Sequence, residues 1–326
     1  MKIVFFGTPD YVTPILDDLN KEFREKQGGS PIEAVVTQEP KETGRAKLLK
    51  FSAVDYWAYK RNIPKYFNPK DLIENNIKAD IGVLASYGKI IPKEVINLFQ
   101  FGILVIHPSL LPEFRGSSPV PAAIITNTNP TGVTIFKMDE KVDHGPIVCQ
   151  FKEEIKDDDN YEILRNRLFS LSSQILVKLI PAYTLGKIKI KTQDDSKAIF
   201  TRIIAKEDSF IPPDILNTAI EGKKLRKNWE IKFIQNCELK PDAEVIERFY
   251  KAMQPWPGIW TNVKLLSDKV TKVLRLKILK VHIEKSPITN HKSQVTKLVL
   301  DEVQLEGKNP VSWKQFIEGY PEAKFI

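Results

Sequence analysis

The chain has 326 residues, too many for one average domain, and two domains are therefore expected. Its 42% apolar and 28% charged residues supply a real core and exclude large-scale disorder, while the net charge of +8 fits a phosphate-rich partner and plain solubility equally well. Two distant cysteines argue against a disulfide framework or a zinc site, and short apolar runs argue against secretion or a membrane span, so a cytoplasmic protein is predicted.

In the first part of the chain, predicted strands alternate with predicted helices. The apolar run at residues 2–6 ends in Gly-Thr-Pro, and Val12–Leu19 then has helical spacing. Tyr161–Ile180 is predicted to be a long helix that Pro181 stops. The remaining predictions are strands at Ile32–Thr37, Asp80–Leu84, Gly102–Ile106, Thr131–Phe136 and Pro146–Phe151, and a helix at Ser52–Asn62. This order predicts an α/β fold with a Rossmann-like, mostly parallel sheet and helices on both faces.

After about residue 200 the pattern changes. A basic cluster at Lys223–Lys227 interrupts the periodicity, and Ala243–Met253 is predicted to form a short helix. Short alternating segments follow at Thr261–Leu265, Val270–Val281 and Gln294–Val303. Such segments are typical of a small antiparallel, OB-like β-barrel. The expected domain limits are 1–200 for the α/β domain, 201–258 for a linker with its short helix, and 259–326 for the barrel.

The loop after the predicted strand Gly102–Ile106 is both stiff and polar. It reads His107-Pro108-Ser109-Leu110-Leu111-Pro112 and continues through Arg115-Gly116 to Pro119. Functional loops often have this character, although a single histidine is more often structural. The run resembles the SLLPxxRG signature of the 10-formyltetrahydrofolate-dependent formyltransferases. The acidic turn Met138–Pro146, which contains Asp143, is similar to the aspartate loop of that family, and the two motifs occur in the family's order.

The resemblance implies transfer of a formyl group to an amine. Attack by a neutral amine makes the formyl oxygen negative, and the folate nitrogen must leave with a proton, so the site needs an oxyanion donor and groups that move protons. The family places a histidine near this oxygen, and an aspartate that polarises the histidine or accepts the amine's proton through water. By position these residues are His107 and Asp143. No metal is implied, because the folate donor already carries an activated formyl group.

One position of the catalytic motif departs from the family. Members of the family usually have an asparagine two residues before the histidine, where its amide donates to the formyl oxygen, but this chain has Val105. Loss of one oxyanion donor costs roughly 10²–10³ in rate. Three explanations stay open: another donor or water replaces the asparagine, the enzyme is degenerate, or the substitution is deliberate. A β-branched residue suits a buried strand, so folding is not expected to suffer.

The resemblance also implies a folate site at the same edge of the sheet. Residues 86–92 resemble the family's loop around the pterin ring, whose amide edge is read by backbone groups, and Gly88 would allow close approach. An ordinary strand-to-helix turn explains these residues equally well. The residues expected to bind folate are Ser86, Tyr87, Gly88, Lys89, Ile90, Ser109, Leu110, Leu111, Pro112, Asp139 and Val142.

Three further stretches resemble the methionyl-tRNA formyltransferases in particular. Residues 37–51 are similar to their basic insertion after the second strand, with Arg45 at its key position, although a solvated surface loop is the alternative. Met253–Thr261 and the tail from Asp301 to Tyr320 resemble the start and the end of that subfamily's C-terminal domain. The resemblance implies initiator methionyl-tRNA as the acceptor and partner, hence a role in translation initiation; nothing requires more than a monomer.

Basic residues are expected to hold the tRNA backbone. Between Thr261 and Asp301 the chain has nine basic and two acidic residues, and a positive surface of this kind binds phosphates without reading the sequence. The residues expected to bind tRNA are Arg45, Lys47, Lys50, Lys264, Lys269, Lys272 and Arg275.

Two other functions are compatible with the same motifs. A folate-dependent sugar-amine N-formyltransferase would share His107 and Asp143, but is not expected to carry both the Arg45 loop and the tail around Trp313. A catalytically impaired relative that only binds tRNA or folate would explain Val105.

Overall fold

The computed structural model describes residues 1–43, 47–223, 225, 227–267, 270–286 and 295–326. The chain divides into two compact units. Unit 1 comprises Met1–Arg115, Pro130–Glu154 and Arg165–Ala198, and unit 2 comprises Gly116–Asn129, Ile155–Leu164 and Ile199–Ile326. Two segments of the first 200 residues thus belong to unit 2. The domain limits 1–200, 201–258 and 259–326 stay a prediction.

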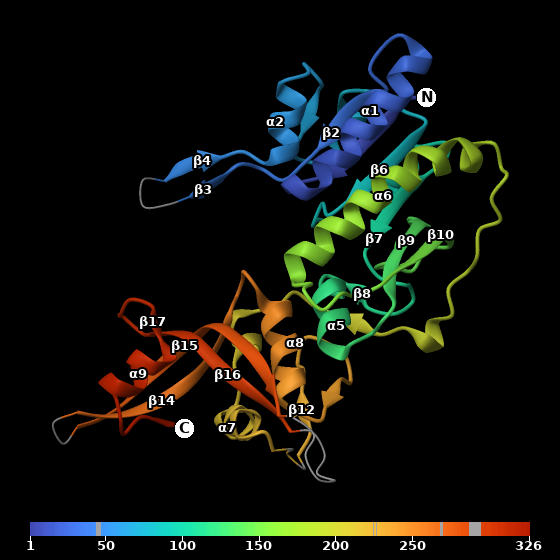
Figure 1. The fold of residues 1–326 in the computed structure, drawn as a ribbon. Helices are drawn as coiled ribbons and strands as arrows, with labels where there is room; N and C mark the ends of the chain where they lie inside the picture. The colour runs from blue at the N-terminus through green and yellow to red at the C-terminus, as the bar shows by residue number, and fades with distance from the viewer. Residues whose placement is uncertain (44–46, 224, 226, 268–269, 287–294) are drawn as a thin grey trace. The chain divides into compact units, whose positions relative to one another are not determined.

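A seven-stranded sheet forms the centre of unit 1 (Figure 1). In spatial order its strands are β10 (Ile147–Glu153), β9 (Thr131–Lys137), β7 (Ile103–His107), β6 (Ile81–Ala85), β1 (Ile3–Gly7), β2 (Ile32–Val36) and β5 (Lys65–Tyr66). The strands from β7 to β5 pair in parallel, whereas β9 and β10 are antiparallel. All strands predicted for this part are present. The two-residue β5 was not predicted, because it is too short to show a periodicity.

Helices cover both faces of this sheet. The helical elements of unit 1 are η1 (Asp10–Val12), α1 (Thr13–Gln27), α2 (Ala53–Tyr59), α3 (Asp71–Glu74), α4 (Lys93–Ile96), most of α6 (Tyr161–Thr184) and η2 (Asp195–Lys197). The prediction that Pro181 stops α6 was wrong, since the helix continues to Thr184. Burial of Leu179 and Ile180 outweighs the one backbone hydrogen bond that the proline cannot make.

The strands of the sheet are buried on both sides. The cluster on one side includes Val4, Phe6, Leu72 of α3, Val95 of α4, Val105 and Phe136. Ile3 and Phe5 alternate with these residues and point to the opposite side. There α1 and α6 lie side by side (Figure 1), joined by a 3.2 Å hydrogen bond from Ser173 Oγ to the carbonyl oxygen of Pro14. Burial on both faces explains why these strands are continuously apolar.

Unit 2 is built on an antiparallel sheet. In spatial order its strands are β17 (Val311–Ser312), β16 (Thr296–Leu305), β15 (Val270–Lys285), β14 (Ile259–Ser267) and β18 (Lys324–Phe325). The other elements are α5 (Pro119–Thr126), β11 (Phe200–Thr201), η3 (Lys206–Ser209), α7 (Pro213–Glu221), β12 (Trp229–Glu230), β13 (Glu238–Leu239), α8 (Ala243–Met253) and α9 (Trp313–Gly319); β8 (Arg115–Gly116) lies at the unit boundary. α8 has the predicted bounds, and it packs on β15 and β16.

The predicted fold class is confirmed: a mostly parallel sheet with helices is followed by a C-terminal antiparallel sheet. No helix in the described ranges is long and apolar enough to cross a membrane.

A buried ion pair ties α2 to β5. Ser52 Oγ caps α2 by accepting a 3.0 Å hydrogen bond from the backbone N–H of Asp55. The side chain of Asp55 is buried, and its Oδ1 lies 2.6 Å from Lys65 Nζ on β5. Burying a carboxylate is costly unless a counter-ion accompanies it.

We therefore expect Lys65→Met to lower the free energy of unfolding by about 3 kcal/mol, because Asp55 stays buried without its cation. Lys70→Met is the matched control, since Lys70 forms an ion pair with Glu94 that is exposed to solvent and therefore contributes little to stability. Urea denaturation measures both values. Equal losses in the two variants would contradict the role given to the buried pair.

Candidate active site

His107 is the last residue of β7, at the carboxyl edge of the parallel strands. Its ring is buried, and its Nε2 lies 2.9 Å from the carbonyl oxygen of Phe114. Because a carbonyl oxygen only accepts, Nε2 must carry a proton and donate it to this bond. The other ring nitrogen, Nδ1, is then the one that can exchange a proton with its surroundings.

Asp143 faces this second nitrogen. Its Oδ2 lies 3.6 Å from His107 Nδ1, which is too long for a direct hydrogen bond but within the range of an ion pair. The residue lies in the turn between β9 and β10 and has a φ of 47°, in the left-handed region that aspartate tolerates better than most residues. The structure thus brings together two predicted residues that are 36 positions apart in the sequence. A proton can pass between them through a water molecule or after a small approach.

Gln193 anchors the turn that carries Asp143. Its side-chain Nε2 donates to the carbonyl oxygens of Asp143 at 2.9 Å and Gly145 at 2.8 Å. Its Oε1 accepts two hydrogen bonds from the buried guanidinium of Arg115, at 3.0 and 2.7 Å. All four hydrogen-bonding capacities of this amide are therefore used. Gly145 belongs to the same arrangement, because a Cβ atom there would collide with the carbonyl oxygen of Lys137.

Two carboxylates contact His144, which follows Asp143 in the same turn. His144 Nδ1 lies 2.5 Å from Asp139 Oδ2, and its Nε2 lies 3.2 Å from Asp195 Oδ2. Asp195 Oδ1 in turn accepts a 2.8 Å hydrogen bond from Arg115, and this bond lowers the pKa of Asp195. Arg115 is thus the centre of a network that joins the signature loop to the aspartate turn.

The sequence analysis missed Gln193, Asp195 and His144 as parts of this site. Arg115 and His144 lie inside the recognised motifs, but Gln193 lies 50 residues from Asp143, in a stretch without strand or helix periodicity. A polar residue in an irregular segment gives no signal of its contacts before the fold is known.

The signature loop is held by residues of the neighbouring strands. Thr134 Oγ1 on β9 accepts from the backbone N–H of Leu111 at 2.9 Å and donates to the carbonyl oxygen of Ser109 at 2.7 Å. Gln150 Nε2 on β10 donates to the carbonyl oxygen of Leu111 at 2.8 Å. Ser109 also donates from its Oγ to the carbonyl oxygen of Glu113, at 2.6 Å. Of the loop residues predicted to bind folate, Ser109 and Leu111 are buried, and Leu110 and Pro112 are half-buried.

Val105 occupies the middle of β7, two residues before His107. Its side chain is 4% exposed and belongs to the apolar cluster of the sheet, together with Leu111 and Phe136. Its backbone pairs with Leu84 on β6 and Phe136 on β9. The valine therefore fits the strand, but it brings no polar atom to the face that carries His107.

The predicted folate loop follows β6, which pairs with β7, so both strand ends reach the same edge of the sheet. Ser86 and Gly88 have positive φ values of 50° and 80°, while the side chain of Ile90 is 88% exposed. Tyr87, by contrast, is fully buried against Phe6, and burial raises the pKa of its phenol to about 12. Its ring belongs to the core, so only its backbone is available to a ligand.

The remaining folate-binding predictions lie on the surface around this edge. Lys89 is exposed, and its Nζ lies 3.8 Å from Glu39 Oε1. Val142, next to Asp143, is 62% exposed. Asp139 is half-buried and is bonded to His144.

The residues predicted to bind tRNA fall into two groups. Arg45 and Lys269 lie outside the described residues. Lys47 and Lys50 are exposed on the hairpin of β3 (Lys41–Thr43) and β4 (Leu48–Lys50) in unit 1. The others are in unit 2, where they lie on β14 and β15: Lys264, Lys272 and Arg275.

The three residues of unit 2 do not share one face of their sheet. Arg275 stacks 4.0 Å above the ring of Trp260, and strand alternation places Lys264 on the same side. Lys272 pairs with the buried Leu265, and therefore belongs to the opposite side. The excess of basic residues in this part of the sequence does not show on which side of the sheet each one lies, and strand register divides these three between the two sides.

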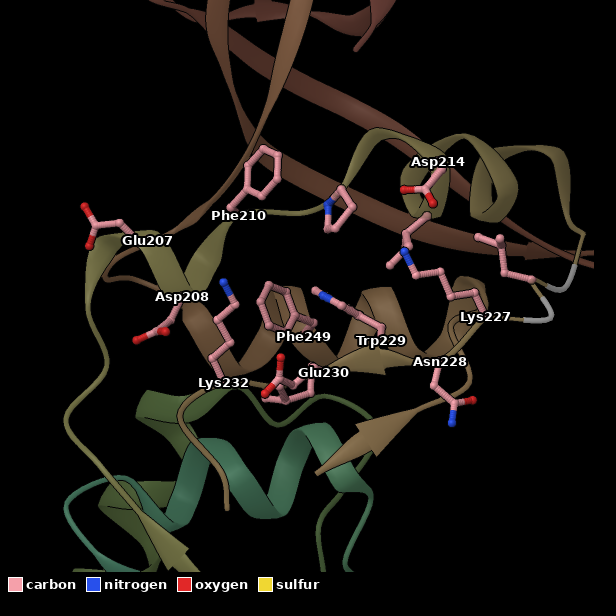
Figure 2. Close-up of a pocket in the computed structure, with 14 residues that line it drawn as sticks. Glu207, Asp208, Phe210, Asp214, Lys227, Asn228, Trp229, Glu230, Lys232 and Phe249 are labelled. Carbon is pink, nitrogen blue, oxygen red and sulfur yellow. The ribbon is translucent and has the colours of Figure 1, made fainter. Parts of the chain in front are cut away.

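A separate hollow lies within unit 2 (Figure 2). Its apolar base includes Phe210, Trp229 and Phe249, and the rings of Trp229 and Phe249 pack 4.6 Å apart. Charged residues of both signs, such as Lys232 and Glu230, surround this base. The hollow contains none of the predicted site residues. Across the described ranges, no three His, Cys, Asp or Glu side chains lie together in a way that would hold a metal.

Comparison with known proteins identifies the family. The profile described as Formyl transferase matches residues 1–180, and the profile described as Formyl transferase, C-terminal domain matches residues 238–321. The methionyl-tRNA formyltransferase of Herpetosiphon aurantiacus is 33% identical, over 85% of this chain and 81% of that protein.

Solved structures give the same result for the fold. The N-formyltransferase of Helicobacter canadensis, crystallised with folinic acid and dTDP-3-aminofucose, matches 96% of this chain and 98% of its own, with a TM-score of 0.61 at 16% identity. The methionyl-tRNA formyltransferase of Clostridium thermocellum matches 94% and 98%, with a TM-score of 0.50 at 16% identity. The resemblance stated from the sequence motifs is confirmed, and the chain belongs to the methionyl-tRNA formyltransferase family.

Proposed function

We propose that this chain transfers the formyl group of 10-formyltetrahydrofolate to the amino group of methionine on initiator methionyl-tRNA. The observation that carries the proposal is the pairing of His107 with Asp143 at the carboxyl end of β7. Ligands of parallel sheets bind at this edge. The names of relatives such as the Herpetosiphon aurantiacus enzyme support the choice of methionyl-tRNA as the acceptor.

His107 and Asp143 supply the two functions that this reaction requires. When the amine attacks the formyl carbon, negative charge develops on the formyl oxygen and positive charge on the amine nitrogen. His107 can donate a hydrogen bond to that oxygen from Nδ1, since Nε2 is bonded to Phe114, while Asp143 accepts the amine's proton, directly or through water. His107 Nδ1 can then give its proton to the leaving nitrogen of the folate and take up the proton that Asp143 accepted, so both residues end the cycle in their starting state.

The folate donor supplies an activated formyl group when bound, and the residues around the sheet edge fit such a ligand. The loop Ser86–Ile90 follows β6, the strand next to the one that ends in His107. Its backbone has positive φ values at Ser86 and Gly88, where its polar groups can face a ligand. The exposed side chains of Ile90 and Val142 are available as apolar walls. Polar backbone groups between apolar side chains suit an aromatic ring with an amide edge.

The hairpin of β3 and β4 supports methionyl-tRNA as the acceptor of the formyl group. Lys47 and Lys50 are exposed on it, and Lys41 lies opposite Lys50. Such a cationic projection suits a phosphate backbone more than a small sugar nucleotide. Arg45, which lies outside the described residues, is proposed as a further contact to the tRNA.

A second candidate function follows from Val105. Because its side chain cannot donate to the formyl oxygen, a chain that binds tRNA and folate with little turnover is the alternative. An assay with 10-formyltetrahydrofolate and charged initiator tRNA, beside the same assay with an amino-sugar nucleotide, separates the candidates. Transfer to tRNA supports the proposal, transfer to the sugar amine overturns it, and tRNA binding without transfer favours the impaired relative.

The variant Val105→Asn should raise the turnover number at least about tenfold, because it restores one donor to the formyl oxygen. Its affinity for tRNA should not change, since Val105 lies within the sheet. Val105→Ala is the control, as it removes volume without adding a donor. If the asparagine variant and the original protein have the same turnover number, another group already donates a hydrogen bond to the formyl oxygen.

The variant Gln193→Met should lower the turnover number by about tenfold to hundredfold, because the turn that carries Asp143 loses both of its amide anchors. The KM for methionyl-tRNA should change little. Gln100→Met, at an exposed position of the same unit, is the matched control. Steady-state kinetics measures both constants, and an unchanged turnover number would show that the turn holds Asp143 without Gln193.

A further inference from the structure

The segment that runs from β4 into α2 is rich in basic residues. Between residues 47 and 65 the basic residues are Lys47, Lys50, Lys60, Arg61 and Lys65. The acidic residue of this stretch, Asp55, is buried and paired with Lys65. Arg61 pairs with Asp17 at 2.9 Å, and Lys47 lies 3.9 Å from Glu42, so the positive charge of the stretch rests mainly on the exposed Lys50 and Lys60. The stretch begins in the hairpin that projects from the sheet (Figure 1).

Three aromatic side chains are exposed within the same stretch. Phe51 is 52% exposed, Tyr56 is 55% exposed and Tyr59 is 68% exposed. Tyr56 and Tyr59 are three positions apart on α2, so they are neighbours on its surface. A single exposed ring is unremarkable in a folded protein, but three adjacent ones form a patch of the kind that binds a partner.

Lysine ammonium groups lie over these rings. Lys65 Nζ lies 5.6 Å from the ring centres of both Phe51 and Tyr59. The same ammonium group is paired with Asp55. Lys60 Nζ lies 4.4 Å from the ring centre of Tyr56. We call these five residues, Phe51, Tyr56, Tyr59, Lys60 and Lys65, the α2 patch.

The α2 patch combines the two features that recognise single-stranded nucleic acid. Exposed rings stack on bases that are not paired, and a lysine beside a ring, such as the exposed Lys60 next to Tyr56, neutralises a phosphate. Lys65 is already paired with Asp55. Duplex nucleic acid cannot use the rings, because its bases face one another inside the helix. An acidic protein surface would use the lysines but would gain less from three flat rings.

We propose that the α2 patch binds the unpaired nucleotides at the 3′ end of the tRNA acceptor arm by stacking them on Phe51 and Tyr59. The inference rests on the proposed function, in which the methionyl group at that end must reach His107. Both the α2 patch and His107 belong to unit 1. The α2 patch thereby adds an aromatic contact to the phosphate contacts expected of the β3–β4 hairpin.

The test compares two forms of initiator tRNA, the intact molecule and one that lacks its unpaired 3′-terminal nucleotides. Dissociation constants are measured by fluorescence anisotropy at one fixed salt concentration. The double variant Phe51→Ala/Tyr59→Ala should bind intact tRNA about tenfold more weakly than the original protein, and should bind the truncated tRNA equally well. Tyr59→Phe keeps the ring and should behave like the original protein. Phe200→Ala, an exposed aromatic side chain of unit 2, is the matched control.

The outcomes separate this inference from the proposed function. Equal loss on both tRNAs would overturn stacking, as would no loss at all in a protein that still formylates methionyl-tRNA. Ring-dependent binding to anionic vesicles, with tRNA affinity unchanged, would assign the α2 patch to a lipid surface and also overturn it. Ring-dependent binding of intact tRNA without any formyl transfer would support the α2 patch and reject the proposed function. Thermal unfolding of each variant shows whether its fold is intact.

Discussion

The position of Asp143 beside His107 is the constraint on which the rest of the site depends. The aspartate lies in a turn, where a backbone would otherwise sample several conformations. One amide, Gln193, holds two carbonyl oxygens of that turn and is itself held by the buried Arg115. A histidine at the end of a buried strand therefore meets a carboxylate whose position is set by a network of neutral and charged hydrogen bonds.

This network also explains the form of the sequence signature. Arg115 does not have to reach the substrate to be required, because its guanidinium joins Gln193 to Asp195. Gly145 is needed for close backbone packing against Lys137. The motif residues thus divide into those that face the reaction and those that fix their geometry, and His107 and Asp143 alone do not describe the site.

Much of the fold was predictable from the sequence, because strands that are buried on both faces are continuously apolar and β7 ends in a polar residue. The pairing of His107 with Asp143 was predictable only from the resemblance to a known family. For Tyr87 the resemblance implied a contact through backbone groups, and only the structure shows that its ring is buried in the core. The faces of Lys264 and Lys272 depend on strand register, which alternation within a single strand cannot supply.

The most direct test of this account is single-turnover formyl transfer to methionyl-tRNA by Asp143→Asn. The asparagine keeps the backbone carbonyl that Gln193 binds, but its neutral amide is a poor proton acceptor. A loss of at least about a hundredfold in rate, with folate and tRNA affinities unchanged, is the predicted result. A rate equal to that of the original protein would show that the pairing of His107 with Asp143 does not move the proton, and would contradict the account.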